Sequence, residues 1–139
     1  MIDENCIFCR VATGEIPAHF VYQDNDLMVI MDINPLAPGH CLLIPKYHAK
    51  YLHELPLNYG EKVGKFLVLI AKALGAENYN ILQNNGKLAH QDIPHVHFHI
   101  IPKPGKDGGL GLRMPGKQAS SENLSKLANE IKEKLDTLL

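Results

Sequence analysis

The sequence contains no tryptophan, few other aromatic residues and only three cysteines. Neither sign of charge dominates, because 14 lysines and arginines stand against 15 aspartates and glutamates, for a formal net charge of −1. Without a basic excess we expect no broad electrostatic attraction to nucleic acid or to an anionic membrane surface. Residues 1–5 lead into no long apolar run, so we expect neither a signal peptide nor a membrane span, and a cytoplasmic location.

The scarcity of cysteine also excludes a disulfide framework in a reducing compartment. Cys6 and Cys9 are separated by two residues, a spacing that is typical of a metal or redox motif. Two reduced cysteines without a ligand are the alternative interpretation of this pair. Cys41 stands apart from both, and we expect it to be buried.

The remaining composition is that of a folded globular chain. Of the 139 residues, 45% are hydrophobic and 21% are charged, which supplies enough apolar side chain to bury one core. We therefore predict a single domain over residues 1–139. No internal repeat is present, and a Gly/Pro-rich stretch at 102–116 predicts a loop before a C-terminal segment.

Five short runs have the composition of β-strands, and turn-forming residues separate them. They lie at 20–23, 27–32, 40–45, 79–83 and 95–101. Consecutive strands joined by turns, together with only two helical segments, predict an α+β fold. The sheet is expected to be antiparallel, because alternating strands and helices would be needed for parallel units.

Two segments carry apolar residues at three- and four-residue spacing, the period of an amphipathic helix. In the first, at 58–74, Asn58 and Glu61 form a capping pair and Gly75 follows the last apolar position. The second lies at 120–138, where the two serines at its start are natural N-caps. We therefore expect two main helices, the second of which ends the chain.

The stretch 95–101 contains three histidines in five residues, and the alternation of side chains along a strand places His95, His97 and His99 on one face. Polar residues on a solvated face are one alternative. A zinc ion held by all three histidines is another, but the first and third lie about 13 Å apart along a strand. Histidine serves as base, nucleophile and metal ligand near neutral pH. We favour a division of labour in which His97 is the nucleophile.

The stretch reads His-Val-His-Phe-His-Ile-Ile, and it resembles the signature of the histidine triad family, His-φ-His-φ-His-φ-φ with φ apolar. Further matching segments lie at 6–9, 14–17, 32–35 and 38–40. The resemblance implies a HIT-like fold, a five-stranded antiparallel sheet with two main helices. It also implies that His97 attacks an α-phosphorus and is transiently nucleotidylated, after which water releases a nucleoside monophosphate.

The family branch that the sequence resembles is the nucleotide-binding, purine nucleoside phosphoramidase-like branch. This implies a homodimeric hydrolase that binds a purine nucleotide such as AMP or a nucleoside phosphoramidate, without an organic cofactor. A dinucleoside polyphosphate hydrolase is one alternative, although that branch usually has glutamine where Asn84 stands. A nucleotide-binding or scaffold protein with incidental hydrolysis is the other, and the intact triad favours catalysis.

Position by position, the resemblance assigns Asp32 to the ribose hydroxyls and Asn84 to the phosphate or bridging group. Both residues are also typical of turns. Gln91 and Asp92 stand near the expected phosphate, and His90 replaces a glycine of the family pattern, so the leaving-group preference stays open. An apolar slot for the base, whose members are also suited to a plain core, completes the site. The expected nucleotide-binding residues are Asp32, Ile33, Asn84, Gln91, Asp92, His97, His99, Ile7, Phe8, Val11, Ile30 and Leu42.

The expected catalytic group comprises His97, His99, His95 and His40. The resemblance places His40 behind the triad, where it would hydrogen-bond to the central imidazole and orient it. An ordinary buried histidine is the alternative interpretation of His40.

The resemblance also implies a zinc site formed by Cys6, Cys9, His48 and His95. A site with four protein ligands is closed and therefore structural. It would join the N-terminal segment to the triad strand. His19 matches no functional position and is expected on the surface.

Overall fold

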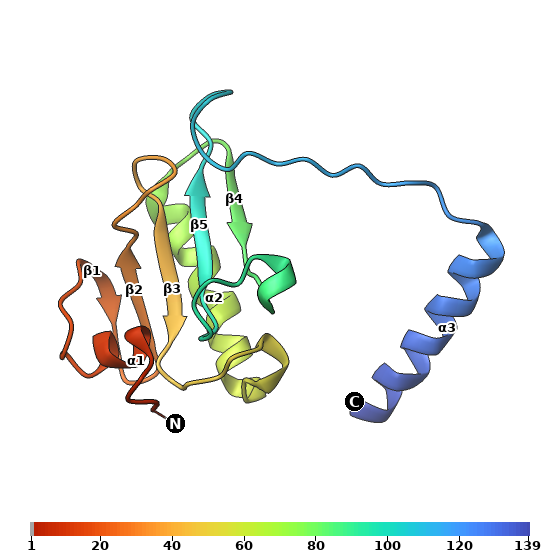
Figure 1. The fold of residues 1–139 in the computed structure, drawn as a ribbon, viewed down its shortest axis with the longest axis horizontal. Coiled ribbons are helices and arrows are strands. Elements are labelled where there is room, and N and C mark those ends of the chain that lie inside the picture. The colour runs from red at the N-terminus through yellow and green to blue at the C-terminus, as the bar shows by residue number, and fades with distance from the viewer. Residues whose placement is uncertain (1) are drawn as a thin grey trace.

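The computed structural model describes residues 2–139 and contains a five-stranded antiparallel sheet (Figure 1). The strands are β1 (Phe20–Gln23), β2 (Leu27–Met31), β3 (Cys41–Pro45), β4 (Tyr79–Leu82) and β5 (Phe98–Pro102). Their order across the sheet is β1-β2-β3-β5-β4, and all neighbours run antiparallel. The predicted α+β class and antiparallel sheet are confirmed.

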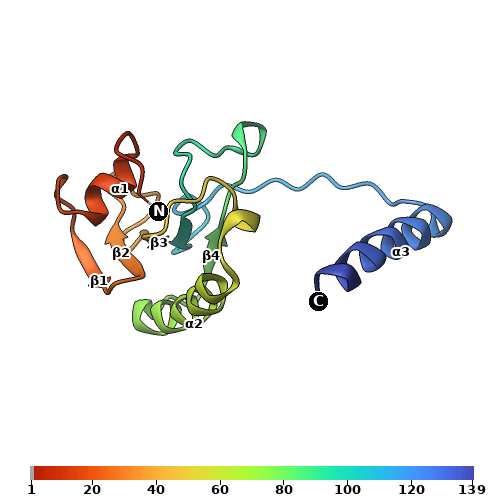
Figure 2. The same ribbon diagram turned by 90° about the horizontal axis from the view of Figure 1, so that it is seen from below.

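The α-helices of residues 2–139 are α1 (Ile7–Ala12), α2 (Leu57–Leu74) and α3 (Ser121–Leu138). Short 3-10 turns lie at Leu52–Glu54 and Lys87–Ala89. Helices α1 and α2 lie on opposite faces of the sheet (Figure 2). The two main helices predicted from the sequence correspond to α2 and α3.

Helix α1 is absent from the sequence prediction, because six residues are too few to display a helical period. Its N-cap, Cys6, makes no side-chain capping hydrogen bond. The buried side chains of Phe8, Cys9 and Val11 instead pack against the sheet. Tertiary packing therefore stabilises this helix, as it does most short helices in proteins.

The central strands are apolar on both faces because both faces are covered. On β2, Leu27 and Val29 pack in the core on the α2 side, whereas Met28 and Ile30 pack in the core on the α1 side. This alternation has the two-residue period of a strand. The α1 side of the sheet also carries the pocket that is described below.

The ends of α2 confirm one sequence prediction and contradict another. Gly75 adopts the left-handed conformation (φ 69°) and its N–H donates to the carbonyl of Ala71, the C-cap expected of glycine. At the N-terminus, the cap is Pro56, which makes no side-chain capping bond. The capping pair predicted for Asn58 and Glu61 is wrong, because the helix already begins at Leu57.

The triad segment enters the sheet later than predicted. Strand β5 begins at Phe98, so His95, which lies in a bend, and His97 both precede it, and the predicted start at residue 95 is wrong. The N–H of Val96 still donates to the carbonyl of Ala49 over 2.8 Å, beyond the end of β3. The predicted alternation of faces persists, because the apolar residues between the histidines lie in the core on the α2 side.

Helix α3 lies away from the sheet at the end of an extended chain (Figure 1). Ser120 caps it as predicted, its Oγ accepting from the N–H of Asn123 over 3.2 Å. All residues of 111–139 are exposed. No element among the described residues therefore covers the apolar stripe of α3. This stripe consists of Leu124, Leu127, Ile131, Leu135 and Leu138. Across residues 2–139, no helix combines the length and the apolar character that crossing a membrane requires.

Candidate functional site

A pocket of about 450 Å³ lies between α1 and the face of strands β2, β3 and β5. Its volume is in the range of small-molecule sites, and its walls are mostly apolar with a few polar groups, as such sites usually are. Eleven residues that the sequence assigned to catalysis or to nucleotide binding line the pocket. They are Ile7, Phe8, Val11, Ile30, Asp32, Ile33, His40, Leu42, Asp92, His97 and His99.

The apolar wall of the pocket is continuous with the core. Phe8, Val11, Ile30 and Leu42 are buried in the cluster between α1 and the sheet and also line the pocket. The slot and core interpretations of these side chains are therefore compatible. The sequence prediction missed eight further lining residues: Ile16, Pro17, Ala18, Asn34, Leu36, Leu82, Ile93 and Ile101. Three of them lie in segments that match the family pattern, Ile16 and Pro17 in 14–17 and Asn34 in 32–35.

One ring nitrogen of His97 is engaged in a hydrogen bond to the protein, and the other is available to a ligand. Its side chain is almost fully buried, and its Nδ1–H donates to the carbonyl of His95 over 2.7 Å. This hydrogen bond selects the tautomer in which Nε2 carries a lone pair. The ring also packs edge-on against Phe8, with 5.1 Å between ring centroids. The His97 ring is therefore held in one orientation at the pocket wall, with Nε2 available as a nucleophile.

His40 contacts His99, so the prediction that it would orient the central histidine is wrong. The N–H of Leu36 donates to His40 Nδ1 over 3.1 Å, and a neutral imidazole with Nδ1 accepting carries its proton on Nε2. His40 Nε2 lies 2.9 Å from His99 Nδ1 and donates to it. The chain of hydrogen bonds leaves the Nε2–H of His99 as a donor for a ligand in the pocket.

The same tautomer argues against a metal ion held by the group Asp32, His40 and His99, although their ligand atoms lie within 4.8 Å of one another. A metal there would need the lone pair of His40 Nε2. The N–H of Leu36 already occupies the Nδ1 lone pair, which places the proton on Nε2. The group is therefore a hydrogen-bond relay.

Burial keeps both histidines of this relay neutral. It lowers the pKa of His99 to about 4, and the neighbouring His97 and His40 act in the same direction. Burial likewise lowers the pKa of His40, against the opposing effect of the Asp32 carboxylate. At neutral pH these side chains act as hydrogen-bonding groups without a charge.

Asp32 serves as a turn residue and also faces the pocket. Its Oδ1 accepts from the N–H of Asn34 over 2.8 Å, and its Oδ2 lies 3.4 Å from His40 Nε2. The structure therefore supports the turn interpretation. The side chain is 18% exposed and lines the pocket, which leaves its carboxylate accessible to a ligand hydroxyl.

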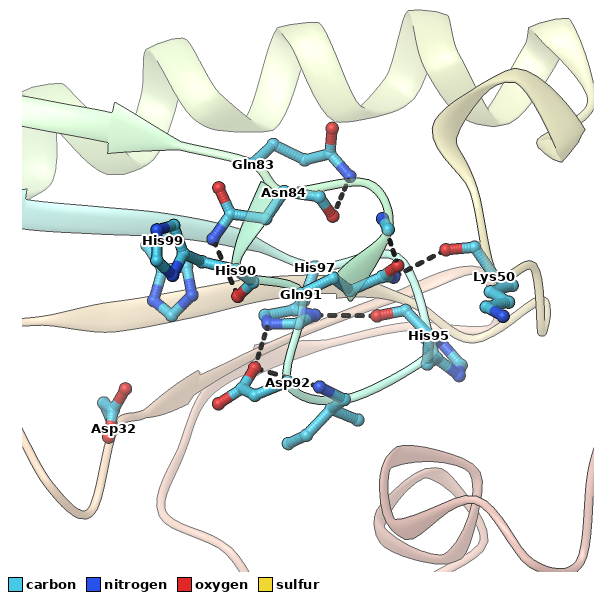
Figure 3. A network of polar contacts seen from close by, with 12 residues as sticks. Asp32, Lys50, Gln83, Asn84, His90, Gln91, Asp92, His95, His97 and His99 are labelled. Atoms are coloured by element: carbon cyan, nitrogen blue, oxygen red, sulfur yellow. Dashed lines mark hydrogen bonds and ion pairs between the residues drawn. The ribbon is translucent and has the colours of Figure 1, made fainter. Parts of the chain in front are cut away.

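Gln91 does not line the pocket, in contrast to its predicted place in the nucleotide site. Its side chain is buried, with Oε1 accepting from the N–H of Gly86 over 2.8 Å and Nε2 donating to the carbonyl of Lys50 over 2.7 Å (Figure 3). Both ends of the amide are thus used to hold two loops together. Asn84 is also outside the pocket lining, and its Nδ2 donates to the carbonyl of His90 over 3.3 Å.

Asp92 lies at the rim of the pocket beside the nucleophile. Its Oδ1 is 3.8 Å from His97 Nε2 (Figure 3), and the side chain is 78% exposed. The 3-10 turn before Asp92 ends at His90, whose φ of 66° lies in the left-handed region where a family glycine was expected. His90 therefore adopts a glycine-like backbone conformation and presents an exposed side chain.

The four predicted zinc ligands converge behind the pocket. His95 Nδ1 lies 3.3 Å from Cys6 Sγ and 3.1 Å from His48 Nδ1, and Cys9 Sγ lies 3.4 Å from the same nitrogen of His48. All ligand atoms are within 4.8 Å of one another. Two thiolates and two imidazoles at such spacing suit the tetrahedral geometry of zinc.

Polar groups next to the two histidines of this cluster orient the imidazoles for binding a metal ion. The Nε2–H of His95 donates to the carbonyl of Pro45 over 2.7 Å, which leaves the Nδ1 lone pair directed at the cysteines. Asp3 Oδ2 lies 3.8 Å from His48 Nε2, the position from which a carboxylate orients a metal-ligating imidazole. The residues thus fit a structural zinc ion. The sequence carried no signal for the part played by Asp3.

The triad histidines do not converge on one point. His95 faces the cysteine cluster, His97 has its Nε2 beside Asp92, and His99 is bonded to His40. Zinc held by all three histidines is therefore incompatible with the described structure. The division of labour expected from the sequence agrees with this arrangement.

Comparison with known proteins gives a consistent result. A family model described as HIT domain matches residues 13–106. Adenosine 5′-monophosphoramidase hnt1 of Schizosaccharomyces pombe is 43% identical over 131 residues, covering 94% of this chain and 98% of that protein. Adenosine 5′-monophosphoramidase HNT1 of Saccharomyces cerevisiae is 40% identical over 135 residues, covering 97% of this chain and 85% of that protein.

Solved structures resemble the whole chain. A hypothetical protein from Leishmania major is similar with a TM-score of 0.91 and 42% identity, covering 96% of this chain and 97% of that one. A histidine triad nucleotide-binding protein from Candida albicans is similar with a TM-score of 0.90 and 37% identity, covering 97% of this chain and 100% of that one. These similarities include the extended segment and the C-terminal helix, since coverage is nearly complete.

The lowered pKa of His99 predicts that the protein loses stability in mild acid. Its pKa is about 4 when folded and 6.5 ordinarily, so the unfolded chain takes up the proton first as the pH falls. Stability is therefore full above about pH 6.5 and decreases toward about pH 4. Urea unfolding midpoints measured across this interval should fall more steeply for the wild type than for His99→Gln. Equal slopes would contradict the assigned cause.

Proposed function

The chain belongs to the HIT domain family, and from that membership we propose that it is a hydrolase of purine nucleoside phosphoramidates or related α-phosphate esters. Membership confirms the resemblance seen in the sequence. Two yeast relatives, 43% and 40% identical, carry the name adenosine 5′-monophosphoramidase. The single observation that carries the proposal is the hydrogen bond from His97 Nδ1–H to the carbonyl of His95 (2.7 Å), because it directs a nucleophilic lone pair at the pocket.

The reaction proceeds in two displacements at the α-phosphorus. In the first, His97 Nε2 forms a bond to phosphorus as the phosphorus–nitrogen bond of the substrate breaks, and the leaving amine takes up a proton from solvent. In the second, water attacks the nucleotidyl-histidine, releases the nucleoside monophosphate and restores His97. The intermediate divides one difficult displacement into two easier ones. The Nε2–H of His99 is the donor available to a phosphoryl oxygen.

The remaining pocket residues bind the nucleoside. The apolar wall around Phe8 and Leu42 accommodates the purine ring, and the Asp32 carboxylate accepts hydrogen bonds from the ribose hydroxyls. Asn84 lies in the loop that Gln91 holds at Gly86, and its amide would reach the phosphoryl group on release from the carbonyl of His90. These roles follow the family resemblance and suit the chemistry of each side chain.

Replacing the nucleophile tests this function directly. His97→Ala should reduce the kcat for adenosine 5′-phosphoramidate by at least about 10³-fold, the usual scale for loss of a covalent nucleophile. The matched control His19→Ala, at an exposed histidine outside the pocket, should keep wild-type turnover. Hydrolysis of diadenosine polyphosphate by the wild type should be slower. Absence of wild-type turnover of both substrates would refute the hydrolase assignment.

We further propose that Cys6, Cys9, His48 and His95 hold a structural zinc ion. When bound, the ion supplies a rigid cross-link between the N-terminal segment and the triad segment. The support is the convergence of the four ligand atoms and the hydrogen bond from His95 to Pro45.

All three cysteines of the chain are free. Free thiols suit the cytoplasmic location that we propose, which cell fractionation would check.

Metal analysis of the purified protein tests the zinc site. The wild type and the control Cys41→Ser, whose buried thiol is outside the cluster, should each carry one zinc ion per chain. The double variant Cys6→Ser/Cys9→Ser should carry none and should unfold at lower temperature. A wild type free of zinc, or a double variant that retains it, would overturn the proposal.

We also propose that the protein is a homodimer in which α3 packs on a second copy. Most helical stability in proteins comes from packing of an apolar face, yet the apolar stripe of α3 is exposed. The edge strand β4 and the outer face of α2 expose a second apolar surface on the same chain: Val68, Leu69, Tyr79 and Ile81. Two uncovered apolar surfaces on one chain favour association between copies.

Sedimentation velocity tests the dimer. The wild type and Glu130→Gln, which alters the polar face of α3, should sediment as dimers at micromolar concentration. Ile131→Glu, which places a charge in the exposed apolar stripe of α3, should shift the distribution toward monomer because a buried unpaired charge is unfavourable. A monomeric wild type, or a dimer unaffected by Ile131→Glu, would contradict the proposed packing.

A further inference from the structure

The pocket has an unusual balance of charge for a site that handles phosphate. Two carboxylates, Asp32 and Asp92, line it, whereas no lysine or arginine of residues 2–139 does so. The other ionisable groups in its lining are histidines, and burial lowers the pKa of His40 and of His99. Within this chain, a ligand with several negative charges therefore finds carboxylates and neutral imidazoles.

Cations on the neighbouring segments are engaged away from the pocket. On α1, the Arg10 guanidinium forms an ion pair with Glu15 at 3.1 Å. In the loop held by Gln91, the Lys50 ammonium lies over the ring of Tyr51, 5.2 Å from its centroid. Neither lines the pocket. These side chains consequently give the phosphoryl end of the site no counter-charge.

The two carboxylates occupy different ends of the site. Asp32 lies across from His97 and Asp92 (Figure 3) and is largely buried. The carboxylate of Asp92 is 3.8 Å from the attacking nitrogen and is mostly exposed. Its Oδ1 also accepts from the N–H of Ile93 over 2.9 Å, which fixes its direction. A phosphorus atom attacked by His97 Nε2 therefore lies near Asp92. An in-line displacement sends the departing group away from the buried His97 and toward the mouth of the pocket, where it passes the exposed carboxylate of Asp92.

We propose that Asp92 selects substrates by the charge of the leaving group: amines that carry a further positive charge are preferred, and leaving groups that carry negative charge are rejected. This inference deepens the proposed function and rests on it. It accounts for the acidic residue at a position that approaches the phosphate. It also names the substrate class: nucleoside phosphoramidates of amines with a second cationic group, rather than polyphosphate chains.

The size of the effect follows from distance and exposure. One unit charge about 6 Å from an exposed carboxylate, at an effective dielectric constant of about 40 to 80, changes the rate by about three- to tenfold. Reversing the sign of the leaving-group charge should thus change kcat/KM by about ten- to hundredfold. The preference should weaken at high salt, because exposed charges are screened.

Three matched substrates test the inference. They are the adenosine 5′-phosphoramidates of putrescine, pentylamine and γ-aminobutyrate, which have similar length and end in a cation, a methyl group and a carboxylate. For the wild type, kcat/KM should fall in that order, with about three- to tenfold between neighbours. Ratios between substrates are compared for each variant, so that any general loss of activity cancels.

Two variants remove the charge at residue 92, and a third variant, at another residue, serves as the control. In Asp92→Asn and Asp92→Ser the three kcat/KM values should converge. Glu77→Gln, which neutralises an exposed carboxylate outside the nucleotide pocket, should keep the wild-type ratios. Equal rates for all three substrates in the wild type, or unchanged ratios in both residue 92 variants, would overturn the inference. Absence of wild-type turnover of all three would instead refute the proposed function beneath it.

Discussion

The arrangement of the site depends on the hydrogen bonds of a single residue, His95. Its ring donates from Nε2 to the carbonyl of Pro45 at the end of β3, and its Nδ1 faces the cysteines at the start of α1. Its carbonyl accepts from the Nδ1–H of His97, the proposed nucleophile. The orientation of the His97 imidazole is therefore fixed by the backbone of a residue whose own ring is held on both sides. Such support of an active group by its surroundings is what preorganises a catalytic site.

The sheet supplies the second constraint, because it places the anchoring apolar side chains on one face and the polar side chains of the site on the other. Val96, Phe98 and Ile100, which alternate with the histidines along the chain, pack in the core on the α2 side, while the histidines face α1 and the pocket. The same alternation directs Ile30 and Leu42 to the pocket from β2 and β3. A rigid apolar anchor on one face thus holds polar side chains in place on the other.

Much of this organisation could be predicted from periodicity and motif. The five strands, α2 and α3 follow local patterns of apolar residues, and the apolar slot follows the family resemblance. What the sequence could not supply is non-local. The length of the triad strand depends on the cluster around His95, and the partner of His40 depends on how close β3 and β5 lie, since Leu42 pairs with His99. Gln91 likewise bonds to backbone groups of two loops that are distant in sequence, so its structural role could not be predicted from its own segment.

The central claim is that His97 Nε2 becomes covalently bonded to phosphorus during turnover. The most direct test is to mix the protein with adenosine 5′-phosphoramidate, quench in alkaline denaturant at times within one turnover, and locate the adduct by mass spectrometry. The account predicts one AMP moiety on the peptide that contains His97, forming and decaying as the free monophosphate appears. Product that accumulates with no such adduct at any time, or an adduct on another residue, would contradict it.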